Sequence, residues 1–300
     1  MKQYLGVLLK GICMGAADVV PGVSGGTMAL ILGIYERLLL AIRHFDFKLF
    51  RLVFAGRITD AARHIDLGFV AALGMGIACA ILFFTRIVPL PTLITTHPEL
   101  IYGLFFGLVA ASIAILLIQQ APLRMGKFAY IVFGAALGLI LVNLVPQQTP
   151  TASWFIALCG AIAISAMILP GISGSFILLI LQKYAFVFDA IGRLDFSVIA
   201  PFAFGCGCGL LVFSRFLSWL LRRFNEATML TIIGVLIGSL WVIWPFQHRV
   251  YETIRGKQRL IHSSPNLPQD WDLNVLSAFV LAVAGVALVI TIHSFSSRQR

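Results

Sequence analysis

A short helix-breaking motif occurs twice in this chain, each time inside a long apolar segment. Pro21-Gly22-Val23-Ser24-Gly25-Gly26 returns as Pro170-Gly171-Ile172-Ser173-Gly174-Ser175, 149 positions later (170 minus 21). A helix break within a membrane leaves backbone N–H and C=O groups that lipid cannot satisfy, so it persists only where protein buries it or a polar cavity lies beside it. Matching breaks in two halves of a membrane protein point to a binding site at the interface of the halves.

The composition agrees with a membrane location. Of the 300 residues, 60% are hydrophobic and 11% are charged, and the mean hydropathy is +0.98. A soluble domain could not bury this much apolar surface, so we predict an all-α polytopic membrane protein. Blocks of about the 20 residues needed to cross a ~30 Å hydrocarbon core occur at 67–90, 99–119, 127–145, 196–217, 227–246 and 273–293.

Other classes of partner fit poorly. The net charge of +10 resides in the connectors between apolar blocks, where membrane topology requires basic residues, so we expect no nucleic-acid partner. The five cysteines lie in apolar blocks without C-x-x-C spacing, and the histidines show no metal-ligand spacing. No nucleotide-binding fingerprint is present. We therefore expect no metal and no cofactor.

The repeat extends beyond the motif. Residues 65–86 align with 194–215 at an offset of 129, and Gly103 and Gly107 match Gly234 and Gly238 at an offset of 131. We predict two repeats that each contain a hairpin and three spans. The first repeat is 1–146, with hairpin 4–42 and spans 67–90, 99–119 and 127–145. The second is 147–300, with hairpin 153–191 and spans 196–217, 227–246 and 273–293.

The length of the hairpins predicts that the repeats are inverted. Each hairpin has 39 residues, which as helix would extend ~58 Å, about twice the hydrocarbon thickness. The chain must therefore return to its starting side, through two re-entrant half-depth helices or two full spans. Three further spans then invert the second half. This topology places both termini and 15 of the 22 lysines and arginines on the cytoplasmic side.

Two connectors have a composition of their own. Connector 43–66 mixes phenylalanines with lysines and arginines, which is typical of an amphipathic helix on an anionic cytoplasmic surface. Connector 247–272 is polar and contains proline, and we expect an ordered outer loop there.

The motifs themselves predict a binding site for an anion. Ser24 and Ser173 occupy N-cap positions, and a helix N-terminus presents unpaired N–H groups with a partial positive charge. Small residues in and after the break let a ligand approach the backbone. The candidate substrate-binding residues are Gly22, Ser24, Gly25, Gly26, Thr27, Gly171, Ser173, Gly174 and Ser175. The alternative is that these small residues only allow tight helix packing.

Charged residues near the motifs suggest further roles. Asp18 is an acidic residue deep in an apolar region, and its repeat equivalent is Met167. It is a candidate for coupling to protons or sodium, or else a helix cap or a partner of Lys10. Glu36 and Arg37 end the first hairpin, as Lys183 and Tyr184 end the second, and these residues are candidate gates or headgroup contacts. Interface anchoring is their alternative role.

A pair of arginines is related by the repeat. Arg86 and Arg215 each follow a hydroxyl residue and would lie at opposite faces of an inverted repeat. They could capture a phosphate at each mouth, or simply extend their charged ends to the membrane surface.

These motifs resemble one known family. Gly15 to Thr27, followed by Tyr35-Glu36-Arg37, and the second copy Leu169 to Ser175 resemble the polyprenyl-phosphate transporter family over essentially the whole chain. The resemblance implies translocation of undecaprenyl phosphate across the bacterial cytoplasmic membrane, from the outer to the inner leaflet, for reuse in peptidoglycan synthesis. It implies alternating access at the paired breaks and a location in the bacterial inner membrane.

Two other functions remain open at this stage. An ion-coupled transporter of a small soluble anion would use the same site. An undecaprenyl-pyrophosphate phosphatase would need a nucleophile or base beside a cationic clamp, and no arginine lies within the motifs. The sequence leaves a homo-oligomer possible.

Overall fold

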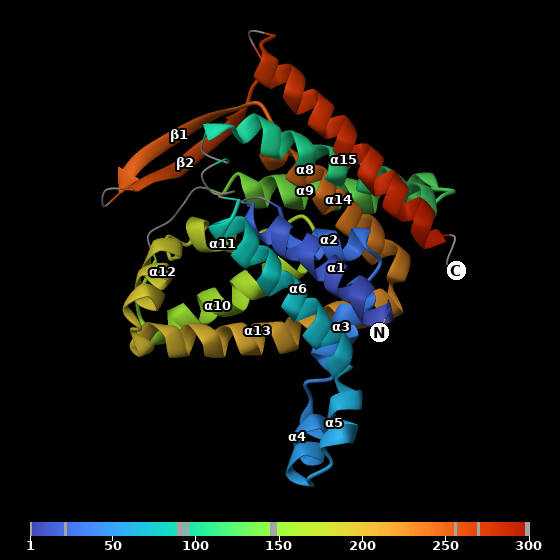
Figure 1. The fold of residues 1–300 in the computed structure, drawn as a ribbon, viewed down its shortest axis with the longest axis vertical. Coiled ribbons are helices and arrows are strands. Elements are labelled where there is room, and N and C mark those ends of the chain that lie inside the picture. The colour runs from blue at the N-terminus through green and yellow to red at the C-terminus, as the bar shows by residue number, and fades with distance from the viewer. Residues whose placement is uncertain are drawn as a thin grey trace.

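The computed structural model describes residues 2–20, 23–88, 93, 96–144, 149–254, 257–268 and 271–297. It is a bundle of helices with one small antiparallel ribbon (Figure 1). Within the described residues, six helices are long and apolar enough to cross a membrane, or up to eight spans if each bent helix pair counts as one. The predicted class, a helical polytopic membrane protein, is confirmed.

The spans lie close to their predicted positions. They are α6 (Leu67–Arg86), α8 (Pro98–Gln119), α9 (Phe128–Val142), α13 (Phe196–Arg223), α14 (Asn225–Ile243) and α15 (Leu273–Ser297). A 3-10 turn, η1 (Met125–Lys127), leads directly into α9. Helix α13 continues six residues beyond the predicted end at 217, because Ser218 to Arg223 contain apolar residues and good helix formers before the two terminal arginines.

Each predicted hairpin consists of three helices. The first contains α1 (Lys2–Val19), α2 (Gly25–Ile31) and α3 (Tyr35–Arg43). The second contains α10 (Ser153–Ile168), α11 (Gly174–Ile180) and α12 (Tyr184–Arg193). The chain bends by 119° between the short helix α2 and the following helix α3, and by 108° between α11 and α12. Seven residues of helix rise only about 10 Å, so neither α2 nor α11 crosses the membrane alone.

Glycines allow the long helices to pack closely within each half. A Cβ on Gly76 of α6 would lie 2.2 Å from the Leu8 carbonyl oxygen of α1, and one on Gly205 of α13 would lie 1.8 Å from the Ala157 carbonyl oxygen of α10. The pairs α1–α6 and α10–α13 occupy corresponding positions in the two sequence repeats. The internal packing of the halves therefore repeats as well as their sequence.

The second and third spans pack across the halves instead. A Cβ on Gly107 of α8 would lie 1.9 Å from the Ala282 carbonyl oxygen of α15. A Cβ on Gly134 of α9 would lie 2.1 Å from the Thr231 carbonyl oxygen of α14. Each half thus contributes one helix to each of these two pairs. The relative orientation of the repeats in a membrane stays a prediction.

Connector 43–66 forms an arm that projects from the bundle beside α3 (Figure 1). It contains two short helices, α4 (Phe47–Phe54) and α5 (Ile58–His64). Phe47, Phe50 and Phe54 follow one ridge of α4 and are 94%, 60% and 87% exposed. The amphipathic character is as the sequence predicted, and its contact with an anionic surface stays a prediction.

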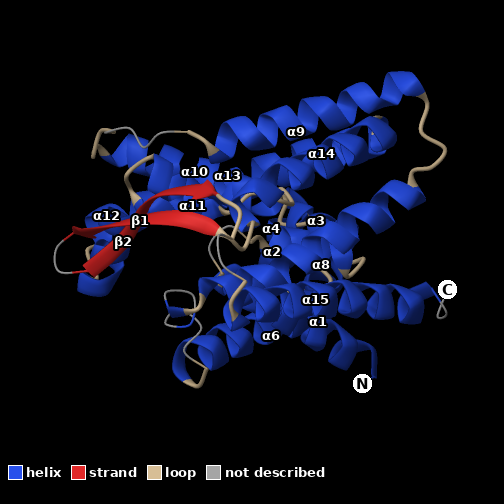
Figure 2. Ribbon diagram, turned by 90° about the horizontal axis from the view of Figure 1, so that it is seen from above, coloured by secondary structure: helices blue, strands red, loops and turns tan. Residues whose placement is uncertain are grey.

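Connector 247–272 contains a β-ribbon rather than a loop alone. Strands β1 (Gln247–Ile254) and β2 (Lys257–Pro265) pair antiparallel, with an irregularity between Val250 and Tyr251. Figures 1 and 2 both show the ribbon at the end of the bundle opposite the marked chain ends. The prediction of an ordered connector was correct, but its strands were not foreseen.

Candidate functional site

The first motif is a capped helix start. Ser24 is the N-cap of α2 in extended conformation, and its hydroxyl oxygen accepts a hydrogen bond from the Gly26 amide at 3.2 Å. The Asp18 carboxylate, at the end of α1, accepts from the Gly25 amide at 2.7 Å. Both N–H groups that α2 leaves unpaired here therefore have an oxygen partner. The predicted N-cap role of Ser24 is confirmed.

Asp18 takes the capping role that was its structural alternative. A Cβ on Gly25 would lie 2.6 Å from Asp18 Oδ2, so glycine is what lets the carboxylate reach the backbone. Lys10 donates to the Leu32 carbonyl oxygen at 2.9 Å. Capping does not exclude ion coupling, because the same carboxylate oxygens could take up a proton or a sodium ion, and coupling stays a prediction.

Three hydrogen bonds in the described part of the chain join the first hairpin to the break of the second. The Ser24 hydroxyl donates to the Met167 carbonyl oxygen at 3.1 Å, and the Tyr35 hydroxyl donates to the Ile168 carbonyl oxygen at 3.0 Å. The Gly171 amide donates to Thr27 Oγ1 at 2.8 Å. We call this set of three bonds the clasp.

The break in the second hairpin explains why these acceptors are available. Pro170 has no N–H to continue α10, and the Gly171 amide, which could have bonded Met167 in a continuous helix, turns to Thr27 instead. The carbonyl groups of Met167 and Ile168 are thereby freed at the end of α10. Lipid could not satisfy them, and the hydroxyl groups of the first hairpin do.

Close backbone approach makes the clasp possible. A Cβ on Gly26 would lie 2.7 Å from the Ile168 carbonyl oxygen and 2.9 Å from that of Met167. Gly171 has φ +90°, a conformation that favours glycine. Ser24, Thr27 and Tyr35 are 1%, 2% and 2% exposed, so the clasp excludes solvent.

The second motif differs from the first in its hydrogen bonds. Ser173 is the N-cap residue of α11 by position, but its hydroxyl pairs with Ser175 Oγ at 2.8 Å and makes no capping bond to the backbone. A Cβ on Gly174 would lie 2.7 Å from the Ala163 carbonyl oxygen. The predicted N-cap position of Ser173 is thus confirmed, but its hydroxyl pairs with Ser175, which stands where the first motif has Gly26.

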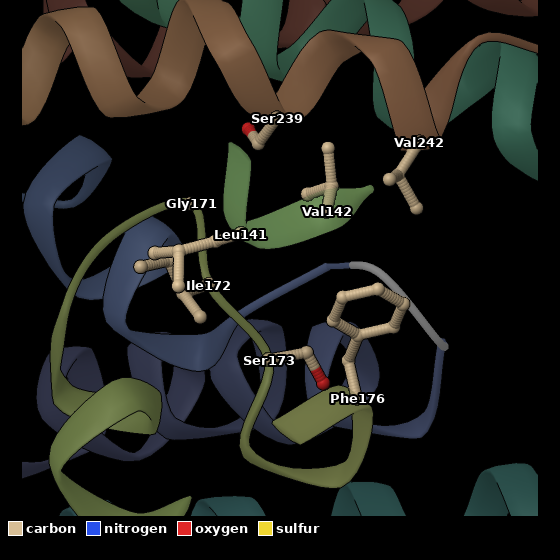
Figure 3. Close-up of a pocket in the computed structure, with 8 residues that line it drawn as sticks. All are labelled: Leu141, Val142, Gly171, Ile172, Ser173, Phe176, Ser239 and Val242. Atoms are coloured by element: carbon tan, nitrogen blue, oxygen red, sulfur yellow. The ribbon is translucent and has the colours of Figure 1, made fainter. Parts of the chain in front are cut away.

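A small pocket lies beside the second motif (Figure 3). Its lining comes from α9, the second motif, α11 and α14 and comprises Leu141, Val142, Gly171, Ile172, Ser173, Phe176, Ser239 and Val242. Its volume of about 10 Å³ is roughly what one water molecule needs. A phosphate headgroup is larger, so the second motif must move away from α9 and α14 before a headgroup can enter here.

The candidate gate residues lie at the edge of the first hairpin. Arg37 Nε and Nη2 approach Asp66 Oδ2 at 2.8 and 2.7 Å, and the guanidinium lies 4.3 Å from the centre of the Phe69 ring. Arg37 therefore ties the start of α3 to the start of α6, while Glu36 is exposed. A gating role for either stays a prediction.

The arginine pair does not join the motifs in this conformation. Arg215 is exposed, and its Nη2 donates to the Phe45 carbonyl oxygen at 3.5 Å, at the root of the arm. Gly22 and the side chain of Arg86 lie outside the described residues.

Sequence reasoning missed the part that Tyr35 plays in the clasp. The available signal was its repeat, because Tyr184 follows the second motif at the same spacing. The described residues also contain no group of three or more histidine, cysteine, aspartate or glutamate residues that could hold a metal ion.

Paired helix breaks, hydrogen-bonded to each other within a bundle of long apolar helices, are the architecture of multi-pass membrane proteins that bind solutes between structural repeats. The sequence model of the undecaprenyl phosphate translocase-like family matches residues 14–261. The chain belongs to this family.

Two curated relatives cover most of the chain. A protein of Vibrio cholerae named polyprenyl-phosphate transporter is 36% identical over 99% of this chain and 98% of its own length. A protein of Staphylococcus aureus with the same name is 31% identical over 82% of this chain and 88% of its own length. Both are named transporters rather than enzymes, which supports a non-enzymatic role. No solved structure matches the chain.

Proposed function

We propose that this protein translocates undecaprenyl phosphate or a closely related polyprenyl phosphate across the bacterial cytoplasmic membrane, from the outer to the inner leaflet, to recycle the carrier lipid. The names of the two curated relatives support the substrate class. The clasp is the observation that carries the mechanism, since it joins the two family motifs at one buried point.

A phosphate monoester could compete directly for the donors in the clasp. The Ser24 hydroxyl, the Tyr35 hydroxyl and the Gly171 amide all donate to uncharged oxygen atoms. Phosphate oxygens are stronger acceptors, and hydrogen bonds to a charged group are shorter and roughly twice as strong. Binding of the headgroup would thus redirect these donors from the opposite hairpin to the ligand. The two hairpins would then no longer be hydrogen-bonded to each other through the clasp.

Release of the clasp gives a physical basis for alternating access. The headgroup would occupy the site between the motifs while the hairpins move against the long helices, and the apolar tail would remain in lipid. Asp18 is the candidate for coupling because its carboxylate caps the same helix that carries Ser24. A proton or a sodium ion on Asp18 would offset its repulsion of an approaching phosphate.

The test uses purified protein in liposomes that contain labelled undecaprenyl phosphate. We expect faster equilibration of the label between leaflets without release of inorganic phosphate, and loss of this activity in Ser24→Ala/Tyr35→Phe. Ser277→Ala is the matched control, because this serine donates to the Leu273 carbonyl oxygen of its own helix, α15. Phosphate release would indicate a phosphatase, and uptake of a soluble anion without lipid movement would indicate a small-anion transporter.

A further inference from the structure

Each hairpin contains a lysine whose ammonium group lies at its bend. Lys10 of α1 donates to the carbonyl oxygen of Leu32, where α2 ends before the turn to α3. Lys183 stands between α11 and α12 and donates to the Thr149 carbonyl oxygen at 2.7 Å. Lys183 is 4% exposed, whereas Lys10 is half-buried.

The two lysines are not equivalent in the sequence repeat. At the offset of 149 between the motifs, position 10 corresponds to Cys159 and position 183 corresponds to Ile34. The first half therefore has Lys10 with Ile34, and the second half has Cys159 with Lys183. Each half has one lysine at this pair of positions, and the two halves carry it on opposite members of the pair.

The two ammonium groups nevertheless lie at corresponding places. Cys159 packs in one cluster with Leu181 and Tyr184, which lie close on either side of Lys183 in sequence. Leu181 is the repeat equivalent of Leu32, and its carbonyl oxygen accepts from Thr149 Oγ1 at 2.5 Å. Lys183 in turn bonds the backbone carbonyl of Thr149, so Lys10 reaches the end of its short helix directly and Lys183 reaches the residue that caps the end of the other.

Hydrogen bonding alone does not require a charge at these places. The Thr149 hydroxyl shows that a neutral donor can satisfy the carbonyl at the end of α11. A lysine inside a membrane protein is costly, and charges found there usually mark the path of an ion or substrate. The presence of a positive charge at the bend of both hairpins, on different members of the pair of positions, therefore points to an anionic ligand.

We infer that Lys10 and Lys183 form two binding stations for a phosphate-monoester headgroup, one at the bend of each hairpin, on either side of the clasp. The inference rests on the proposed function and adds residues outside both motifs. The short helix α2 separates Ser24 from Leu32 by about 12 Å. The half-buried Lys10 and the sealed Lys183 make the first station the more accessible one in this conformation.

Moving the charge tests the inference more sharply than removing it. Lys183→Ile removes the second station, and Cys159→Lys/Lys183→Ile restores its charge in the arrangement of the first half. Lys10→Cys and Lys10→Cys/Ile34→Lys form the reciprocal pair. Lys48→Met is the matched control, because this exposed lysine lies on the projecting arm. Equilibrium binding of labelled undecaprenyl phosphate and of labelled undecaprenol is measured on the purified full chain, with inorganic phosphate as competitor.

We expect each single lysine variant to bind undecaprenyl phosphate about tenfold or more weakly, which corresponds to the loss of one hydrogen bond between charged groups. Binding of the uncharged undecaprenol should not change, and each transposed variant should recover most of the lost affinity. Normal affinity in the single variants would overturn the inference while leaving the proposed function intact, as would a folded transposed variant without recovery. If the parent chain binds inorganic phosphate but not the lipid, and the lysine variants lose that binding, the proposed substrate is wrong and the stations are supported.

Discussion

Replacing Thr27 by valine tests the clasp at a single atom. Valine has nearly the same shape but lacks Oγ1, which accepts the Gly171 amide at 2.8 Å. Thr27 is 2% exposed, so water cannot readily replace the lost acceptor. Interhelical hydrogen bonds in membrane proteins contribute about 0.6 kcal/mol on average and up to about 1.7 kcal/mol. At 1.4 kcal/mol for each factor of ten, the local opening equilibrium should rise about 3- to 16-fold.

Amide hydrogen exchange measures this change directly. A peptide that spans the second motif should report faster exchange at Gly171 in Thr27→Val, since Pro170 has no amide to contribute. Thr231→Val is the control, because Thr231 bonds the Ala227 carbonyl oxygen within its own helix. Unchanged exchange at Gly171 in a folded Thr27→Val protein would refute the clasp. An equal rise throughout α10 to α12 would show general destabilisation and count against it too.

Other residues make separate predictions. Gly26→Ala should abolish lipid movement in liposomes, because its Cβ would lie 2.7 Å from the Ile168 carbonyl oxygen. Gly74→Ala should transport normally, because its Cβ would meet nothing within 4 Å. Equal activity of the two variants would contradict the close approach at Gly26. Asp18→Asn keeps an oxygen atom to cap α2 but removes the charge. The variant should therefore unfold at the same temperature as the parent, while its transport no longer responds to a proton or sodium gradient. A retained response would exclude Asp18 from coupling. Although burial raises the pKa of the Asp46 carboxyl, hydrogen bonds from the His64 side chain and the Leu49 amide outweigh it and hold that pKa below its ordinary value. The stabilisation should be complete above the unfolded pKa of about 3.9 and disappear as pH falls through the lowered folded pKa. The difference in unfolding temperature between the parent and Asp46→Asn should therefore shrink below about pH 4. A difference that grows below this pH would contradict a lowered pKa of Asp46.

Local features of the chain were predictable, and contacts between distant segments were not. The spans follow from hydropathy, since about 20 apolar residues need a membrane, and Ser24 follows from the preference of serine for an N-cap. The hydrogen bond from Tyr35 to Ile168 joins residues 133 positions apart, and no local pattern encodes which carbonyl a tyrosine will reach. Ser173 and Ser24 share a motif but differ in partners, because the neighbouring Ser175 replaces a glycine. The β-ribbon was missed because both of its strands lie within a polar connector, where no apolar pattern indicates that the two segments pair.

The glycine contacts between the halves determine which parts can move as units. Helix α8 packs on α15 and α9 packs on α14, so each pair draws one member from either side of residue 146. Cutting the chain there would separate each of these four helices from the helix on which its described glycines pack. The boundary between the two sequence repeats therefore does not coincide with the boundaries between the groups of helices that pack together. Under the proposed alternating access these four helices would form a common frame, and α1–α3 with α6 and α10–α12 with α13 would be the two units that move against it once the clasp opens.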